Sequence, residues 1–173
     1  MEILLSRCTL REWRDGDEAS LVRHADNPRV ARLLRDSFPQ PYSLDDARRW
    51  IRECASAKPP TTLAIAVEGE PCGSVGLHPQ PDIFRKSAEI GYWLGESRWG
   101  IGIMTEAVSG FTAYALREFD LEHLFATVFE NNPASARVLE KAGYELEGRL
   151  RRHATKDGVT MDVLFYGMVR PGR

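Results

Sequence analysis

The sequence predicts one α/β domain of the α+β kind, in which helices cover both faces of a mixed, mainly antiparallel sheet. Two turn signals, Glu68-Gly69-Glu70 and Lys156-Asp157-Gly158, each join two strand-like runs and therefore favour antiparallel hairpins. One parallel pair is also required, because a strand, a helix and a second strand follow one another over 87–129. Helices and strands do not alternate regularly, which excludes a doubly wound parallel sheet.

The N-terminal half is predicted to contain one strand, three helices and a hairpin. We expect the first strand over 3–13, where apolar residues alternate loosely. Two prolines keep 38–42 extended, since proline interrupts a helix and restricts the residue before it. Hairpin strands follow over 61–67 and 71–77. The residues expected to cap the three helices are Asp17, Asn27 and Ser43.

The C-terminal half is predicted to carry the strand–helix–strand unit and a closing hairpin. We expect strands over 87–94 and 123–129, and closing strands over 144–148 and 159–169. Between 87–94 and 123–129 lies a helix that follows Gly102. Its apolar face consists of Met104, Ala107, Val108, Phe111, Ala115 and Phe119. A shorter helix begins at the cap Asn132 and Pro133 and stops at Gly143.

Length and composition are those of an ordinary globular protein. The 173 residues, 43% of them hydrophobic and 28% charged, suit a single domain over 1–173 with a sizeable core. A net charge of −2 with both signs interspersed argues against a general nucleic-acid binder. No apolar run approaches the ~18 residues that a membrane span needs. The first residues lack the apolar core of a signal peptide, so we expect a cytoplasmic protein without a membrane partner.

The cysteines and histidines give no sign of a metal site. Cys8, Cys54 and Cys72 are far apart and form no C-x-x-C motif, so we expect reduced and mostly buried thiols. The four histidines show no ligand spacing, and we expect no metal. They are His24, His78, His123 and His153.

The stretch from 87 to 119 carries the main chemical signal. A strand, a turn containing Gly100 and Gly102, and a helix start follow one another directly. Such a helix start presents unpaired N–H groups and a partial positive charge to an anion, and glycine lets the backbone approach closely. A plain turn is the alternative. Two other phosphate loops are excluded, because no Lys-Ser or Lys-Thr follows the glycines and Thr105 stands where G-x-G-x-x-G needs glycine.

Three segments in this order resemble those of one enzyme family. They are EIGYWL over 89–94, WGIGIMTEA over 99–107 and ENNPASARVLEKAGY over 130–144. At this spacing the chain resembles the GNAT family of N-acetyltransferases, and most closely its RimJ/RimL-type branch of ribosomal-protein N-terminal acetyltransferases. The resemblance covers nearly the whole chain. It implies acetyl-CoA as co-substrate, and a central strand that splays from its parallel neighbour so that pantetheine lies in the resulting V.

The resemblance also implies where the cofactor binds. The family's pyrophosphate loop reads Q/R-x-x-G-x-G/A; Trp99 takes its first place, and Met104 departs from the small last residue. The Trp93 and Leu94 backbone would pair with pantetheine. Asn132 would reach the cofactor from the other arm, or be a plain helix cap, or both. The remaining residues implied are Arg98 (alternatively a solvated turn residue), Trp99, Gly100, Ile101, Gly102, Ile103, Met104, Thr105 and Ser135.

Two residues are candidates for the acetyl-transfer step. Glu89, the only carboxylate of its strand, is the candidate general base, and a salt-bridged or solvent-facing role is the alternative. By the resemblance, Ser135 lies near the thioester and would donate to the departing thiolate; Tyr144 is the second candidate. Ser135 is alternatively an ordinary residue of a helix start.

The expected acceptor is a primary amine, most of all the α-amine of a protein N-terminus. That amine has a pKa of ~7.7–8, against ~10.4 for lysine, so it needs less help from a base. A polyamine, an amino acid or an amine drug are alternatives, as is a CoA-sensing module without turnover. We expect the acceptor pocket to come from residues 25–45, and the protein to be a monomer or a homodimer.

Overall fold

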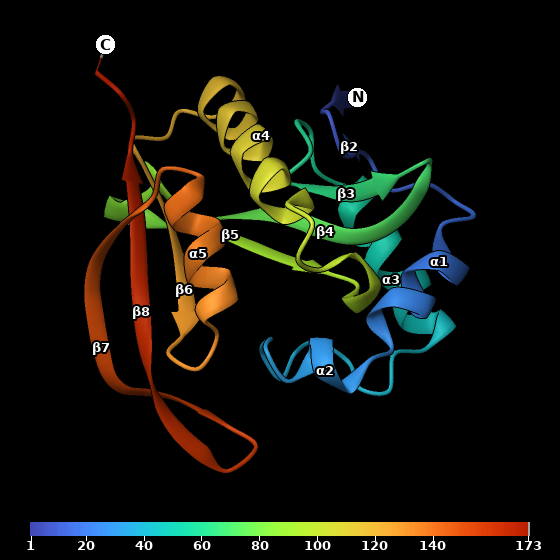
Figure 1. The fold of residues 1–173 in the computed structure, drawn as a ribbon. Helices are drawn as coiled ribbons and strands as arrows, with labels where there is room; N and C mark the ends of the chain where they lie inside the picture. Colours follow the sequence, from blue (N-terminus) through green and yellow to red (C-terminus); the bar gives the residue numbers. More distant parts are fainter. Residues whose placement is uncertain (173) are drawn as a thin grey trace.

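The computed structural model describes residues 1–172, which form an eight-stranded sheet and five α-helices (Figure 1). Arg173, the last residue of the predicted domain, lies outside the described residues. The strands are β1 (Glu2–Leu4), β2 (Thr9–Arg11), β3 (Thr62–Val67), β4 (Glu70–Pro79), β5 (Ser87–Leu94), β6 (His123–Phe129), β7 (Glu145–Lys156) and β8 (Val159–Val169). The helices are α1 (Glu18–Ala25), α2 (Pro28–Ala31), α3 (Leu44–Ala55), α4 (Ile103–Glu118) and α5 (Pro133–Lys141), with short 3-10 turns at Asp82–Phe84 and Glu96–Arg98.

The strand order across the sheet is β1-β2-β3-β4-β5-β6-β8-β7. Every neighbouring pair among the described strands is antiparallel except β5 and β6, which are parallel and joined by α4. The predicted mixed, mainly antiparallel sheet is therefore confirmed. Both hairpin turns have positive φ at their two central residues, 52° and 85° at Glu68 and Gly69 and 50° and 78° at Asp157 and Gly158. This is the backbone that two-residue hairpin turns favour.

The parallel pair is short, and it opens the sheet. Pairing between β5 and β6 covers only Ser87–Glu89 on one strand and His123–Phe125 on the other. Beyond Glu89, β5 stays paired with β4, and β6 stays paired with β8. The two strands thus separate in the middle of the sheet, and this leaves main-chain groups of 90–94 unpaired toward β6. The expected splayed pair is present.

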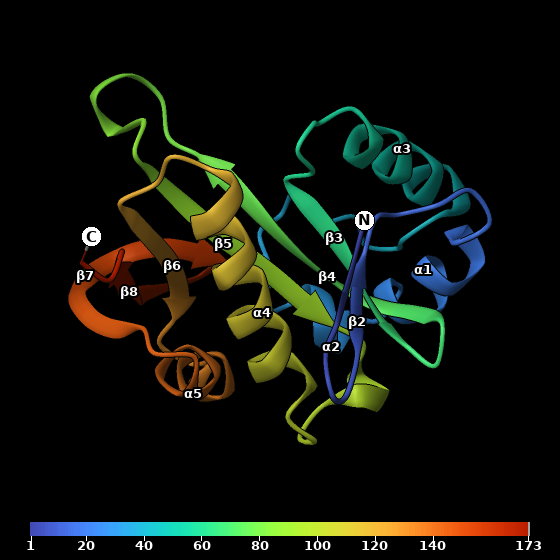
Figure 2. The same ribbon diagram turned by 90° about the horizontal axis from the view of Figure 1, so that it is seen from above.

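Two hydrophobic cores pack against the sheet. Figure 2 shows α4 and α5 on one side of the sheet and α1 and α3 on the other. In β3, Leu63 and Ile65 belong to the core beneath α4, whereas Ala64 belongs to the core shared with α1 and α3. Successive strand residues point to opposite faces, so this alternation assigns the helices to two layers. The prediction of helices on both faces is confirmed.

The predicted first strand over 3–13 is wrong, because the chain reverses in the middle of it. β1 and β2 pair antiparallel, with Ile3 opposite Leu10. Ser6 and Arg7 form the turn, and their backbone N–H groups donate to the Glu106 carboxylate of α4 at 3.1 and 2.8 Å. A long-range contact therefore holds a turn that contains no glycine, proline or asparagine, which is why the sequence pattern resembles one strand.

Two of the caps predicted in the N-terminal half are confirmed. The Asn27 side chain accepts from the backbone N–H of Arg29 at 2.8 Å. Ser43 and Asp46 form a reciprocal capping box at the start of α3, in which each side chain accepts from the other's backbone N–H.

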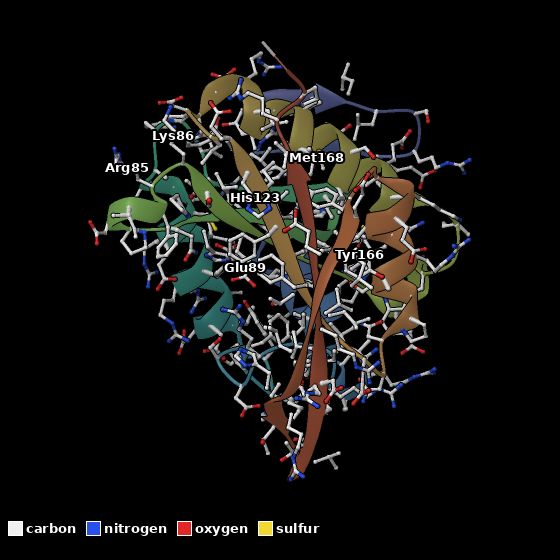
Figure 3. All side chains as sticks on the ribbon, turned by 90° about the vertical axis from the view of Figure 1, so that its left-hand side faces the viewer. Arg85, Lys86, Glu89, His123, Tyr166 and Met168 are labelled. Atoms are coloured by element: carbon white, nitrogen blue, oxygen red, sulfur yellow. The ribbon has the colours of Figure 1, made fainter. Side chains whose placement is uncertain are left out.

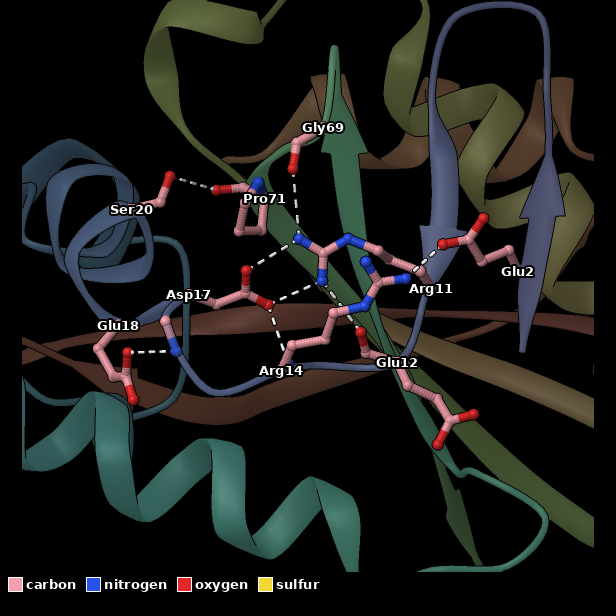
Figure 4. Close-up of polar contacts among 10 residues, drawn as sticks. Glu2, Arg11, Glu12, Arg14, Asp17, Glu18, Ser20, Gly69 and Pro71 are labelled. Atoms are coloured by element: carbon pink, nitrogen blue, oxygen red, sulfur yellow. Dashed lines mark hydrogen bonds and ion pairs between the residues drawn. The ribbon is translucent and has the colours of Figure 1, made fainter.

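Asp17 precedes α1 as predicted, but its side chain does not cap the helix. Its two carboxylate oxygens instead accept from the Arg11 guanidinium at 2.7 and 2.9 Å, and one also accepts from the Arg14 backbone N–H at 3.0 Å (Figure 4). Arg11 and Asp17 are both buried, and Arg11 also donates to the Gly69 carbonyl. The Asp17 carboxylate pairs with Arg11 rather than capping α1, because a buried guanidinium left without a partner would cost more free energy than an uncapped helix.

The closing hairpin is longer than the predicted strands over 144–148 and 159–169. β7 continues to Lys156 through register shifts between Leu146 and Gly148 and between Leu150 and Ala154. The far end of the hairpin extends to the segment between α2 and α3 (Figure 1), where Lys156 Nζ lies 2.6 Å from a carboxylate oxygen of Asp36. The ion pair thus joins the far end of the hairpin to the segment between α2 and α3.

Candidate active site

A cavity of about 680 Å³ lies where β5 and β6 separate, and it is open to solvent. It extends from the start of α4 to the segment between α2 and α3. The predicted site residues that line it are Glu89, Trp93, Leu94, Arg98, Trp99, Gly100, Gly102, Ile103, Met104, Thr105, Asn132 and Ser135. Ile101 does not line the cavity; its side chain is exposed, and its carbonyl accepts from Arg7.

One end of the cavity is a helix start without a side-chain cap. Gly102 is the N-cap of α4 with φ of 85°, and Gly100 has φ of 79°; both values suit glycine. Because glycine offers no capping side chain, the N–H groups of the first turn of α4 stay available to a ligand. Arg98, Arg137 and Lys141 also line the cavity and add positive charge to it, although Arg137 pairs with Glu140. The arrangement suits a phosphate group.

The glycine loop is tied to the end of β5 by Trp99. Its indole Nε1 donates to the Leu94 carbonyl at 2.7 Å. This bond occupies one lone pair of a carbonyl that the resemblance assigns to pantetheine. The bond also suggests a role for a tryptophan at the first position of the loop motif, because its indole N–H ties the loop to the preceding strand β5.

Glu89 lies where pairing between β5 and β6 ends. Its side chain is 13% exposed and accepts three hydrogen bonds. Thr127 Oγ1 of β6 donates to Oε1 at 2.7 Å, and Arg35 Nη2 donates to both carboxylate oxygens at 2.6 and 2.7 Å. Figure 3 labels Glu89 on β5 and His123 on β6; in the register of the two strands Phe125 lies opposite Glu89, and His123 lies opposite Ser87. Glu89 therefore lies at the base of the V, and it is salt-bridged.

Alternation along β5 divides the site residues between two faces. Ile90 and Leu94 belong to the core beneath α4, and Tyr92 packs against it. Trp93 packs against the opposite core, where its ring meets Phe38 at 5.5 Å. Glu89 is an even number of residues from Trp93 and so shares its face. The carboxylate and the helix start of α5 thus approach the opening from opposite sides of the sheet.

Ser135, in the first turn of α5, meets β5 through a residue that sequence reasoning missed. Its Oγ lies 2.8 Å from the Tyr92 hydroxyl. Burial raises the pKa of Tyr92, so that hydroxyl stays protonated and able to donate. The one sequence signal for Tyr92 was the alternation of side chains along β5, which places it on the same face as Ile90 and Leu94 and so toward α5.

Tyr144 is not placed to act on a ligand in this cavity. Its side chain is buried, its hydroxyl lies 2.8 Å from Thr112 Oγ1 of α4, and it does not line the cavity. Burial raises its pKa to about 12. The expectation of Tyr144 as the second candidate donor is corrected: it belongs to the packing between α4 and α5.

Asn132 caps α5 as predicted, since its Oδ1 accepts from the Ser135 backbone N–H at 3.3 Å. The same side chain lines the cavity, and its amide nitrogen remains as a donor. Both expected roles are therefore compatible with its geometry.

The other end of the cavity is aromatic and comes in large part from the segment predicted to form the acceptor pocket. Phe38 contacts both Tyr42 and Trp93, with ring centroids 5.2 and 5.5 Å apart. The members of 25–45 that line the cavity are Val30, Leu33, Leu34, Arg35, Ser37, Phe38, Pro39 and Tyr42. Sequence reasoning did not single out Arg35 or Thr127, because nothing local in the chain pairs either residue with Glu89.

The three cysteines are free, and none lines the cavity. Burial raises the pKa of Cys8 and of Cys54 to about 12 and that of Cys72 to about 11. Within residues 1–172, no three His, Cys, Asp or Glu side chains gather as metal ligands would. Over the same residues, the helices are all too short or too polar to span a bilayer.

Known proteins share this fold and sequence pattern. Residues 7–145 match the family model described as an acetyltransferase (GNAT) domain. The uncharacterized N-acetyltransferase YoaA of Bacillus subtilis is 34% identical over 57% of this chain and 55% of its own length. The ribosomal-protein-serine acetyltransferase of Escherichia coli is 32% identical over 49% of this chain and 47% of its own. This chain thus spans about half the length of these two relatives.

A solved structure agrees over more of the chain. Mycobacterium smegmatis RimJ, in complex with a CoA-disulfide, superposes with a TM-score of 0.79 at 27% identity. The superposition covers 94% of this chain and 81% of that one.

Proposed function

Because this chain belongs to the GNAT family of acyl-CoA-dependent N-acetyltransferases, we propose that it transfers the acetyl group of acetyl-CoA to the α-amine of a protein N-terminus. The observation that carries the proposal is the opening between β5 and β6, with a bare helix start at one end and a recessed, partly exposed carboxylate at its base. The name of the E. coli relative, a ribosomal-protein-serine acetyltransferase, favours a protein acceptor.

The cofactor end would bind through main-chain groups. The unpaired edge of β5 at Trp93 and Leu94 would pair with pantetheine, and the N–H groups from Gly100 to Thr105 would hold the pyrophosphate. Arg98, the Thr105 hydroxyl and the Asn132 amide would add contacts.

The acceptor end would deliver a free amine. At neutral pH about a tenth of an α-amine with a pKa of ~8 is already neutral, against well under a hundredth of a lysine, so only modest help from a base is needed to take up the proton that the attacking amine loses. Glu89 would accept that proton, directly or through one water, from an amine that approaches on the face of Trp93. Direct attack on the thioester then needs no enzyme-bound acetyl group, which agrees with a cavity that no cysteine lines.

The departing thiolate would be met from the opposite face. A free thiol has a pKa of ~8.5, so its thiolate leaves with hydrogen-bond donation and needs no complete proton transfer. Ser135 Oγ would donate this bond, while the Tyr92 hydroxyl, 2.8 Å away, holds the serine in place. Three free thiols, two of them buried, suit a reducing compartment, so we propose that the reaction takes place in the cytoplasm.

The test is acetyl transfer to a panel of amines, followed as free thiol released from acetyl-CoA. The panel holds peptides with free N-terminal serine or alanine, an N-terminally blocked lysine peptide, spermidine and free amino acids. We expect release with the free N-terminal peptides and only background with the blocked peptide. Release with spermidine or free amino acids alone would show a small-molecule acceptor. Tight acetyl-CoA binding without release by any amine would show a CoA-sensing module.

A further inference from the structure

The ion pair between Arg35 and Glu89 closes the acceptor side of the cavity where an amine must approach. We propose that Arg35 occupies the binding site of the acceptor's ammonium group, and that a protonated primary amine exchanges with it at Glu89. The inference rests on the proposed function, because it takes Glu89 as the group that meets the amine. It makes Arg35 a specificity-determining residue, with cationic primary amines as its substrate class.

The geometry of the pair is that of a single nitrogen rather than of a guanidinium fork. Arg35 Nη2 alone donates to both Glu89 oxygens, at 2.6 and 2.7 Å. Arginine usually binds a carboxylate through two nitrogens in parallel, which an ammonium group cannot reproduce. A primary ammonium also has one nitrogen with three N–H donors, so it can make the same two bonds.

The two partners differ in how strongly each is held. The Glu89 side chain is 13% exposed, whereas that of Arg35 is 67% exposed. A recessed carboxylate is costly to leave without a cation, while an exposed guanidinium is well solvated when it is released. Within residues 1–172, Arg35 is the one cation within ion-pair distance of Glu89. When a substrate ammonium replaces Arg35, the recessed Glu89 carboxylate keeps a cationic partner, and the released Arg35 guanidinium is solvated by water.

The segment that carries Arg35 is anchored independently of Glu89. The neighbouring Asp36 pairs with Lys156 of β7 at 2.6 Å, and Phe38 packs against Tyr42 and Trp93. The exchange thus requires only rotation of the Arg35 side chain and leaves the wall of the pocket in place. Thr127 keeps its bond to Oε1, which holds the carboxylate in the same orientation.

A cationic placeholder has a distinctive kinetic consequence, because it competes with the substrate. We compare Arg35→Ala, Arg35→Lys and wild type, with a peptide bearing a free N-terminal serine as the acceptor. Steady-state thiol release gives KM for the peptide and for acetyl-CoA. Calorimetry of the peptide into the protein saturated with CoA gives the peptide Kd without turnover. Arg48→Ala is the control, since Arg48 is 55% exposed on α3 and pairs with Asp45 away from the cavity.

Removal of the competitor should tighten acceptor binding. We expect Arg35→Ala to lower peptide KM and Kd about 5-fold, which corresponds to ~1 kcal/mol, and to leave KM for acetyl-CoA unchanged. Arg35→Lys should retain the wild-type values, because a single nitrogen suffices. Arg48→Ala should also match wild type.

Peptide KM that is unchanged or raised in Arg35→Ala would overturn the proposal, since it would make Arg35 a bystander or a direct contact of the substrate. Arg35→Lys behaving like Arg35→Ala would also overturn it. Failure of the proposed function has a different signature, because wild type would then bind CoA yet release no thiol with any amine. The calorimetric comparison still tests Arg35 in that case.

Discussion

The two ends of the cavity are built from different parts of the chain. At the proposed cofactor end most of the binding groups would be main-chain N–H groups, within a few residues of Gly102 at the start of α4. At the acceptor end they are side chains from separate elements: Arg35 before α3, Glu89 on β5 and Thr127 on β6. A main-chain site tolerates exchange of most side chains, whereas a side-chain site changes with each of them. This difference suits a shared cofactor and acceptors that vary.

The largest effect is expected at the acceptor end. Glu89→Gln keeps the shape of the side chain and removes its charge, so kcat should fall about 10²–10⁴-fold. The Kd of acetyl-CoA, measured by calorimetry, should stay at the wild-type value because the phosphate end is unaltered. Glu122→Gln, an exposed carboxylate away from the cavity, is the control. A wild-type rate at neutral pH would remove Glu89 from the mechanism.

The scaffold of the acceptor end depends on a buried ion pair. Asp17→Ala leaves the Arg11 guanidinium buried without its partner, so the free energy of unfolding should fall by about 3–5 kcal/mol. Urea denaturation measures the change. Asp15→Ala, at an exposed position two residues earlier, should alter stability by less than ~0.5 kcal/mol. Equal stability of the two variants would mean that the Arg11–Asp17 ion pair does not stabilise the packing of α1 and α3 against the sheet.

At the proposed cofactor end, acetyl-CoA affinity should fall when a negative charge is added and change little when a neutral side chain is exchanged for another. Thr105→Glu adds a carboxylate to the first turn of α4 on the cavity wall, and acetyl-CoA affinity should fall about 100-fold, or ~2.8 kcal/mol. Thr105→Val should cost far less. Ser109→Glu adds the same charge one turn further along and serves as the control. If calorimetry gives equal affinities for Thr105→Glu and Ser109→Glu, the phosphate site lies elsewhere.

Gly102→Asp would also add a carboxylate at this helix start, but it would test phosphate binding less cleanly than Thr105→Glu. A Cβ at this position would lie 3.6 Å from Arg7 Nε, so the new carboxylate would meet an arginine. The residue would also hold a strained backbone at φ of 85°. Charge and strain would then be confounded, and for this reason Thr105 is the better position.

The smallest effect near neutral pH concerns the thiols, which neither end uses. Burial raises the pKa of Cys8, Cys54 and Cys72 above the ~8.5 of a free thiol. Iodoacetamide at pH 7 should therefore leave the native protein unmodified and active, while urea-unfolded protein takes up three groups by mass. Modification and inactivation of the native protein at pH 7 would contradict the assignment.

The same shifts give a pH dependence of stability. Above pH ~8.5 the unfolded chain releases thiol protons that the folded chain keeps, so the unfolded state binds fewer protons. The free energy of unfolding should thus be insensitive to the thiols at pH 7 and fall as the pH rises above ~8.5. Urea titrations at pH 7 and pH 10, with a Cys72→Ala variant as comparison, measure this term.

Local chain properties alone determined the parts of the molecule that depend on a few consecutive residues. The caps at Asn27, Ser43 and Asn132 and the glycine loop before α4 were predictable, since each needs a residue type at a fixed distance along the chain. The mixed sheet followed from the turn signals and the single crossover. The backbone has few allowed conformations, so caps, turns and crossovers each require particular residue types at fixed spacings, and these can be recognised in the sequence.

Only the tertiary structure decided which side chains meet. Arg35 and Glu89 are 54 residues apart, and Tyr92 and Ser135 are 43 apart, so no spacing rule relates them. The turn at Ser6 exists because Glu106 of α4 binds it, 100 residues away. Asp17 pairs with Arg11 and leaves its helix uncapped, because burial of the arginine outweighs a local preference. The glycine loop at the proposed cofactor end was thus predictable from the sequence, whereas the pairing of Arg35 with Glu89 at the proposed acceptor end appeared only when the fold brought distant residues together.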